Sequence, residues 1–516
     1  MPINNFFLIY RTITILNLVL FETIFVVFSS SILAVEGIPS KPNVLFIVIE
    51  DTNWKSYGCY GNTVCKTPNI DKLASSGVVF EHAYCQGSAC NASRTSFLSG
   101  LRPRTTRVWN NGTAIRNVQP EWVIGMPELF KQAGYTTIDI GKIYHHGADF
   151  APKQMMAFDR IENGERPEGW QGPAPILKFP NVKPDPAKEA KSRIIRDLKD
   201  GEAKKANSDR YGDSGLDQEN EGDWQRAKIA ATILEEYAND KNTEKKPFFI
   251  VLGQSKPHAP FLSPTKFAKK YDPAQIPDPV ATISSFKDFP YIKRATVSNN
   301  DIFRETPSTP ETAKEAIAAY YGCVSFIDDN LSLPLNTLEK TGLDKNTIVI
   351  LLGDHGVHLG DHNMWSKYSM LEGTHHAPLI IRVPNAKENG KICREIVEFV
   401  DILPTLIDLC DLRKPDKLEG VSFTPLLQKN VAISWKSAAF IVDQDNGQAV
   451  RTKKYSYMEF GDPKKNDGYK SALFDLEKDP NETVNRINDP QYTTIKQELA
   501  ELLKQGWKQA LPPDTK

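Results

Sequence analysis

The stretch Val44–Ile49 reads VLFIVI and is followed at once by Glu50 and Asp51. Six consecutive apolar residues predict a strand that is buried on both faces, because a strand with one wet face alternates apolar and polar residues. Strands of this kind form parallel sheets that helices cover on both sides. The two acidic residues stand at the carboxyl end of the strand, the edge at which open α/β sheets bind their ligands.

Three more segments show a buried strand followed by polar residues. They are Thr136–Ile140 with Gly141-Lys142 and His145, Phe248–Leu252 with Lys256 and His258, and Thr347–Leu352 with Asp354-His355. Helical patterns lie between them, including one capped by Asp223 and one that starts at Thr309-Pro310 and runs through Phe326. We therefore expect an α/β fold with a large, mostly parallel (mixed) sheet sandwiched by helices.

Two regions depart from this pattern. Residues 160–222 are rich in Lys, Asp, Glu, Pro and Gly without periodicity, which predicts a polar insertion in a catalytic domain spanning 41–429. After about residue 430, short strands and a terminal helix at Tyr492–Trp507 predict a C-terminal subdomain, 430–516, with a short antiparallel sheet. The strands are expected at Ala439–Val442, Tyr455–Phe460 and Ala472–Leu476.

The N-terminal segment predicts export, through a signal peptide or an anchor. Arg11 precedes an apolar stretch that ends in small residues at Ala34, and Asn17 and Glu22 interrupt it. Residues 1–34 are therefore interpreted as a cleaved signal peptide, because a charge inside the bilayer is costly for a permanent transmembrane helix. The stretch is nevertheless long enough to act as an uncleaved membrane anchor. Either interpretation exports the remainder to a periplasmic, secreted or lumenal location. Membrane association follows only if the segment stays uncleaved.

The composition excludes some functions. The 516 residues include 63 Lys+Arg and 64 Asp+Glu, so the net charge is -1. This balance argues against a nucleic-acid partner but allows a local basic pocket for a small anion. The chain has seven cysteines, an odd number that leaves at least one without a partner in disulfides.

Three acidic residues at the strand ends predict a metal site. Glu50, Asp51 and Asp354 are expected to meet there, and buried like charges need a counter-charge. Oxygen ligands favour calcium, with magnesium as the alternative, over zinc, and the chain has no HExxH or CxxC motif. Five of the nine histidines lie between His355 and His376, and some of these five must be structural.

The segment Cys90–Gly100 reads CNASRTSFLSG. Its helical pattern places Cys90 at a helix N-terminus beside Arg94, where both the helix and the guanidinium favour an anionic group. The alternative interpretation is a buried, inert cysteine, which is the commoner fate of a free thiol.

These residues resemble the type I sulfatases, a branch of the alkaline phosphatase superfamily, whose signature is Cys-x-Pro/Ala-x-Arg followed by a short helix and Leu-Thr-Gly. The resemblance covers about residues 41–480. Within the family, three segments resemble the iduronate-2-sulfatase branch: Phe97–Pro103, Lys256–Phe261 and Trp365–Ser369.

The resemblance implies a mechanism. A maturation enzyme would oxidise Cys90 to formylglycine, and its hydrated aldehyde, activated by the cation, would attack the sulfur of a sulfate ester. The implied metal ligands are Glu50, Asp51, Cys90, Asp354 and His355. Arg94, Lys142 and Lys367 would hold the sulfate and diol oxygens. His258, helped by Lys367, would protonate the departing sugar oxygen, and His145 would take a proton from the diol.

One departure from the family leaves alternatives open. The family usually has Asp-Asp after the first strand, whereas this chain has Glu50-Asp51. Glutamate keeps the charge, and calcium tolerates variable geometry, so we expect a working site with a possible change in metal affinity. The departure supports one alternative, a catalytically impaired glycan-binding protein. The other alternative does not depend on Glu50 and is a phosphatase, phosphodiesterase or phosphonate hydrolase of the same superfamily.

The expected substrate is a sulfated carbohydrate. Four residues beyond the nucleophile helix either contact the sugar or simply pack and solvate their loop: Arg107, Trp109, Asn110 and Arg116. Conversion of Cys90 would leave six cysteines as thiols or bridges, and Cys59 and Cys65 are close enough in sequence to close a small loop.

Overall fold

The computed structural model describes most of the chain after the N-terminal segment. The described residues are 41–113, 122–145, 157–162, 210–279, 302–303, 308–365, 367–428, 434–443, 447–461 and 470–512. The predicted signal or anchor and most of the predicted insertion at 160–222 therefore lie outside them. Within the described ranges, no helix has the length and apolar character needed to cross a membrane.

A mixed eight-stranded sheet forms the centre of the structure. Its order is β10-β2-β9-β8-β1-β6-β3-β4, and all neighbours are parallel except those of β9. The strands are β1 (Asn43–Ile49), β2 (Val78–Tyr84), β3 (Thr136–Ile140), β4 (Arg160–Glu162), β6 (Phe248–Gln254), β8 (Thr347–Gly353), β9 (Leu379–Arg382) and β10 (Lys391–Glu398). All seven residues of β1 are buried between β6 and β8, which confirms the strand predicted from VLFIVI.

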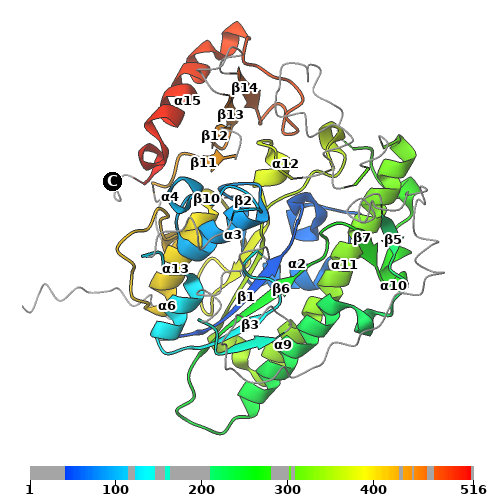
Figure 1. The fold of residues 1–516 in the computed structure, drawn as a ribbon, viewed down its shortest axis with the longest axis vertical. Helices are drawn as coiled ribbons and strands as arrows, with labels where there is room; N and C mark the ends of the chain where they lie inside the picture. The colour runs from blue at the N-terminus through cyan, green and yellow to red at the C-terminus, as the bar shows by residue number, and fades with distance from the viewer. Residues whose placement is uncertain are drawn as a thin grey trace, which may run out of the picture. The chain divides into compact units, whose positions relative to one another are not determined.

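Helices cover both faces of this sheet (Figure 1). One layer holds α3 (Cys90–Ser99), α6 (Met126–Gln132) and α13 (Ile402–Cys410), and the other holds α2 (Pro68–Ser75), α9 (Gly222–Asn239) and α11 (Pro310–Thr341). Phe46 of β1 contacts Phe97 of α3 with ring centroids 5.9 Å apart, whereas Leu45 joins the apolar cluster formed with α9 and α11. This alternation explains why both faces of β1 had to be apolar.

Two helices differ from their predictions. Helix α11 does not end near Phe326 but continues to Thr341, because buried Leu331, Leu335 and Leu338 extend its apolar face. It ends at Gly342, which adopts a φ of 72° that glycine tolerates without strain. Asp223 does not cap α9: the N-cap is Glu221, and Asp223 lies inside the first turn.

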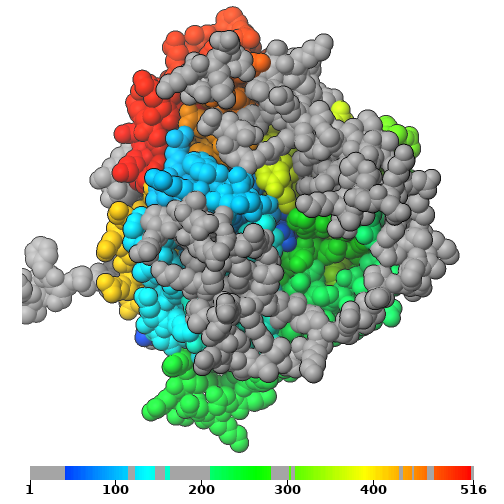
Figure 2. Space-filling view, in the orientation of Figure 1, coloured from blue at the N-terminus to red at the C-terminus, as the bar shows by residue number. Residues whose placement is uncertain are grey.

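A second sheet of four antiparallel strands lies near the C-terminus and confirms the predicted short sheet. It contains β11 (Ala439–Val442), β12 (Gln448–Arg451), β13 (Tyr455–Phe460) and β14 (Lys470–Asp475). Helix α15 (Thr493–Gln505) packs Leu499 and Leu503 into the same cluster as Val450 of β12. In Figure 2 the orange and red C-terminal residues lie against the blue segment that follows α3. The domain boundary at residue 430 stays a prediction.

The remaining elements are short. They are α4 (Pro103–Thr106), α10 (Thr265–Ala268), α12 (Glu372–His375), α14 (Thr424–Leu427) and a two-stranded sheet of β5 (Tyr211–Asp213) and β7 (Phe261–Ser263).

Candidate active site

The strand ends that sequence reasoning singled out meet at one edge of the central sheet. Ile49 at the end of β1 pairs in register with Gln254 of β6 and with Gly353 of β8. Glu50 and Asp51 therefore emerge beside Asp354, and the Asp51 amide donates to Asp354 Oδ1 at 2.9 Å. Parallel pairing thus brings together side chains that are about 300 residues apart in sequence.

Each of the three carboxylates is paired with a different cation. Lys367 Nζ lies 2.7 Å from Asp51 Oδ2, and Arg94 Nε donates to Asp354 Oδ2 at 3.0 Å. Lys142 Nζ contacts Glu50 Oε1. The six charges are almost fully buried, so each one depends on its partner rather than on water.

The pairing also determines how the carboxylates titrate. Burial alone would raise the pKa of Asp51, but His258, Lys367 and His355 outweigh it and hold the pKa at about 2. The pKa of Asp354 is likewise lowered despite burial, chiefly by His355 and Arg94. Both groups are therefore ionised at neutral pH and can serve as oxygen ligands.

Cys90 begins helix α3 in the middle of these charges. Its Sγ lies 3.2 Å from His355 Nε2, 3.6 Å from Lys367 Nζ and 3.8 Å from Glu50 Oε1. Only 1% of the residue is exposed, and this burial raises the pKa of the thiol well above its ordinary value. A protonated thiol is a poor nucleophile, so Cys90 in its unmodified form is unsuited to attack.

The same residues offer a cation site. Ligand atoms of Asp51, Cys90, Asp354 and His355 all lie within 4.8 Å of one another, and Glu50 forms a second such group with Asp51 and His258. A buried, oxygen-rich donor set with surplus carboxylates fits a hard divalent cation. The residues present therefore fit a divalent cation, and the choice of calcium over magnesium stays a prediction.

Arg94 joins the nucleophile helix to the segment that carries Lys142. Its Nη1 donates to the carbonyl oxygens of Lys142 (2.8 Å) and Ile143 (3.1 Å). Its Nη2 is buried and has no hydrogen-bond partner among the described residues. One guanidinium nitrogen is thus left for a bound anion.

Two histidines complete the site. His258 Nδ1 donates to the Ala259 carbonyl at 2.7 Å, so its other nitrogen, Nε2, 3.7 Å from Asp51 Oδ2, carries a proton to deliver only when the ring is an imidazolium. The His258 side chain is 38% exposed and so faces solvent. Burial, together with Lys142 and Arg94, lowers the pKa of His145 to about 3, so His145 is neutral at pH 7 and able to accept a proton.

Comparison with known proteins identifies the family. The sulfatase family model matches residues 42–412, and a model described as N-sulphoglucosamine sulphohydrolase, C-terminal, matches residues 360–509. The chain belongs to the sulfatase family. It is accordingly a sulfuric ester hydrolase.

Individual relatives agree with this assignment. A sulfatase of Formosa agariphila is 32% identical over 476 residues, covering 90% of this chain and 86% of the relative. Iduronate 2-sulfatase of Homo sapiens is 29% identical, covering 74% of this chain and 71% of the relative. Among solved structures, the phosphonate monoester hydrolase of Agrobacterium radiobacter shares the fold with a TM-score of 0.70 at 21% identity, covering 91% of this chain and 96% of that one.

Of the five clustered histidines in this sulfatase, only His355 contacts Cys90. His358 Nε2 lies 2.8 Å from Ser369 Oγ, and His376 Nδ1 lies 2.9 Å from Glu372 Oε1. His375 Nδ1 is 3.9 Å from Cys85 Sγ. These contacts give the neighbouring histidines structural roles, as the sequence pattern required of some of them.

Two residues that sequence reasoning missed support the sulfatase site from behind. Tyr320 of α11 donates to the Asp51 carbonyl at 2.8 Å and accepts from the Asn53 amide at 2.8 Å. It thereby holds the turn in which Asp51 has a φ of 50°. Asn111 accepts from the Asn91 amide at 3.0 Å and donates to Tyr368 Oη at 2.8 Å, linking α3 to the segment of Lys367. No catalytic or metal-binding motif marks either residue, although Asn111 begins the Asn-Gly-Thr glycosylation sequon at residues 111–113.

The predicted sugar-contacting residues fall into different classes. Arg107 is exposed and Trp109 is half-buried, so both remain candidates. Asn110 supports its own loop, because its carbonyl accepts from Asn91 Nδ2 at 3.0 Å and its Oδ1 accepts from the Gly112 amide at 3.0 Å. Arg116 lies outside the described residues. Cys59 and Cys65 do not form a disulfide.

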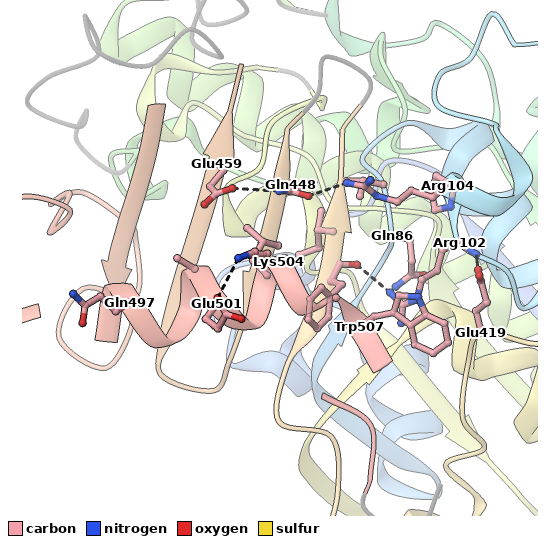
Figure 3. Close-up of a pocket in the computed structure, with 17 residues that line it drawn as sticks. Gln86, Arg102, Arg104, Glu419, Gln448, Glu459, Gln497, Glu501, Lys504 and Trp507 are labelled. Carbon is pink, nitrogen blue, oxygen red and sulfur yellow. Dashed lines mark hydrogen bonds and ion pairs between the residues drawn. The ribbon is translucent and has the colours of Figure 1, made fainter. Parts of the chain in front are cut away.

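A separate cavity of about 970 Å³ lies between α4, β11 and α15 (Figure 3). Arg102, Gln448, Glu501 and Trp507 are among its lining residues, and none of the candidate catalytic residues is. It is therefore distinct from the sulfatase site.

Proposed function

We propose that this sulfatase is exported and removes sulfate from a sulfated sugar, using a formylglycine made from Cys90 and one divalent cation, calcium in preference to magnesium. The observation that carries the proposal is the setting of Cys90. It is buried at the start of α3, with His355, Lys367 and Glu50 all within 4 Å of its Sγ.

The two absent groups supply complementary chemistry. Formylglycine, in its hydrated form, would provide a hydroxyl nucleophile at the position of Cys90, where the thiol itself is kept protonated by burial. The cation would be held by Glu50, Asp51, Asp354 and His355, and it would act as a Lewis acid that screens the charge of the sulfate.

The chain's own cations would bind the sulfate. Arg94 offers its unpartnered Nη2, and Lys142 and Lys367 stand on the same carboxylate cluster. Fixed positive charges in a buried site stabilise negative charge as it develops on the transferring group, with little reorganisation. All three cations would act on the sulfate rather than on the sugar.

The two histidines would move protons. His258, which faces solvent, would give its Nε2 proton to the departing sugar oxygen, because an alkoxide is a poor leaving group unless it is protonated. His145, held neutral, would accept a proton from the nucleophile.

The substrate class follows from the relatives. Human iduronate 2-sulfatase is named for a sulfated uronic acid, and the second matching family model is named for a sulfated glucosamine. We propose that the substrate is likewise a sulfated pyranose within a glycan. The substitution at Glu50 keeps its carboxylate in the cluster, so it does not favour the alternative of an impaired glycan-binding protein.

The nucleophile is tested by mass analysis of the Cys90 peptide from protein made in its native host. We expect the aldehyde form, and we expect Cys90→Ala to lose sulfate release by on the order of 10³-fold or more. Cys393→Ala, at an exposed edge strand, is the matched control. An unconverted thiol in active protein, or full activity in the Cys90→Ala variant, would contradict the proposed mechanism.

The substrate is tested by a screen of sulfated mono-, di- and polysaccharides, with a phosphonate monoester as the competing class. We expect turnover of at least one sulfated sugar and much weaker turnover of the phosphonate. Activity restricted to aryl sulfates, or greater activity on the phosphonate, would overturn the sugar assignment.

A further inference from the structure

The first turn of α9 contacts the loop that carries His258. Asp223 Oδ1 accepts from the Ser255 amide at 2.7 Å, and Oδ2 accepts from the Lys256 amide at 3.0 Å. The Ser255 carbonyl in turn accepts from the His258 amide at 3.1 Å. A short chain of hydrogen bonds thus runs from Asp223 through Ser255 to the backbone of His258.

The same carboxylate is tied to the segment that carries Lys142. Arg226, one turn along α9, pairs with Asp223 Oδ1 through Nη1. Its Cδ packs so closely on Gly141 that a Cβ at this glycine would come within 2.7 Å of it. Gly141 has a φ of 103°, which also requires glycine. Arg226 therefore packs against the turn at Gly141 that positions Lys142.

An ordinary helix-capping role does not explain Asp223. A capping aspartate bonds the amide groups of its own helix, whereas Asp223 bonds two amides that follow a different secondary-structure element, β6. It is only 5% exposed, and burying a carboxylate is costly unless its hydrogen bonds are made. The Asp223 carboxylate therefore stabilises the loop that follows β6 and does not cap helix α9.

We propose that Asp223 is a positioning residue for proton transfer by His258, and that Arg226 couples this loop to the Lys142 turn. The inference rests on the proposed function, in which His258 protonates the leaving group. A general acid must be within hydrogen-bond reach of the atom it protonates, and a misplacement of about 1 Å can cost on the order of 10²-fold in rate.

The first test measures the loop without using turnover. Hydrogen exchange is compared between wild type, Asp223→Asn and Gln225→Ala, the last being a control in the same turn whose side chain bonds only locally, to the Glu219 carbonyl. We expect the Ser255 and Lys256 amides to exchange at least about tenfold faster in Asp223→Asn and to be unchanged in Gln225→Ala. Unchanged exchange in Asp223→Asn would overturn the inference.

The second test uses two substrates that differ in their need for an acid. 4-Nitrophenyl sulfate releases a stable phenolate, whereas phenyl sulfate releases a poorer leaving group. We expect Asp223→Asn to lower kcat for phenyl sulfate about tenfold more than for 4-nitrophenyl sulfate, with KM little changed. Arg226→Lys should shift the same ratio less.

The outcomes separate the possible roles. Equal losses of kcat on both substrates would mean that Asp223 only supports the fold, and this result would overturn its positioning role. Because the exchange measurement needs no turnover, failure of the proposed function and failure of this inference give different results.

Discussion

At the residue scale, Glu50 has one methylene group more than the aspartate that the family usually carries at this position, and the site accommodates it. Its carboxylate reaches Lys142 Nζ, while the neighbouring Asp51 is paired with Lys367. Burial would raise the pKa of Glu50, but Lys142, His258 and Arg94 outweigh it and lower the pKa. The longer side chain therefore remains an ionised oxygen donor on the edge of the candidate metal site.

Glu50→Gln should weaken metal binding without changing side-chain size. The variant removes one of three negative charges, so we expect the calcium Kd of EDTA-treated protein to rise about tenfold or more, as measured by titration calorimetry. Glu81→Gln is the control, because Glu81 is half-buried, lies on β2 away from the carboxylate cluster and pairs with the exposed Arg394. An unchanged Kd in Glu50→Gln would remove this residue from the metal site.

At the scale of elements, the sequence predicted the strands whose neighbours on both faces are apolar. β1, β6 and β8 were predictable because their runs are continuously apolar and buried. β10 was not predicted, because an edge strand with exposed Lys391 and Ile392 lacks that pattern. β2 was missed because Glu81 and His82 interrupt its apolar run.

The candidate site divides in the same way. The clustering of Glu50, Asp51 and Asp354 at strand ends could be predicted, since parallel pairing brings strand ends together independently of the loops. Tyr320 could not, because its partner Asp51 is 269 positions away and the hydroxyl looks like any other on a buried helix face. Asp223 was assigned to its own helix because an acidic residue at a helix start is usually a cap.

Tyr320→Phe tests how helix α11 supports the β1 turn. The variant removes the hydroxyl that bonds the Asp51 carbonyl and the Asn53 amide, so we expect a loss of about 1–3 kcal/mol in unfolding free energy and a lower kcat. Tyr321→Phe changes the next residue on the helix, whose hydroxyl accepts from Asn62 Nδ2 at 3.2 Å and does not contact the β1 turn, so this variant should retain kcat. Equal kcat values in the two variants would count against this role.

At the scale of the whole molecule, a buried ionic network joins the central sheet to the C-terminal sheet. Lys436 Nζ lies 2.6 Å from Asp401 Oδ1 and 2.8 Å from Glu398 Oε2, and Arg102 Nη2 lies 2.6 Å from the same Glu398 oxygen. The Phe440 amide of β11 donates to Glu398 Oε1 at 2.9 Å. The network therefore connects the N-terminus of α4, which Arg102 caps, with β10 and β11.

Lys436→Met should destabilise the protein strongly, because it leaves Asp401 and part of Glu398 without a counter-charge. We expect a loss of about 3–5 kcal/mol in urea unfolding. Lys453→Met, which breaks an exposed pair with Glu395, should cost about 0–1 kcal/mol. Similar urea midpoints for the two variants would show that the network contributes little.

Buried histidines predict how stability depends on pH. Burial lowers the pKa of His375 to about 3, below its unfolded value near 6.5. Since the unfolded chain then binds the proton first, stability should fall as pH decreases from about 6.5 toward 3, by about 1.4 kcal/mol per pH unit for this group. Carboxylates such as Glu398, with a pKa lowered to about 2 because Arg102 and Lys436 outweigh burial, lose their contribution only below about pH 4.5.

Urea midpoints at pH 7 and pH 5 check this expectation. Burial raises the pKa of Asp328 to about 6 and that of Glu482 to about 7, so these carboxyl groups also titrate in this window and the comparison needs a histidine variant. The wild-type midpoint should be lower at pH 5, and His375→Asn should show a smaller difference between the two pH values, whatever its stability at pH 7. A difference as large as that of the wild type would assign the pH dependence to other groups.

The burial of Cys90 has a consequence for the order in which the proposed modification and folding would occur. All ten residues of α3 are buried, and Cys90 itself is 1% exposed. An enzyme that modifies this side chain must bind the surrounding peptide in its own active site. In the folded protein the residues of α3 are buried, so they are not accessible for such binding. Under the proposed function, conversion of Cys90 would therefore have to precede folding, and a chain that folded first would keep an unmodified thiol at this position.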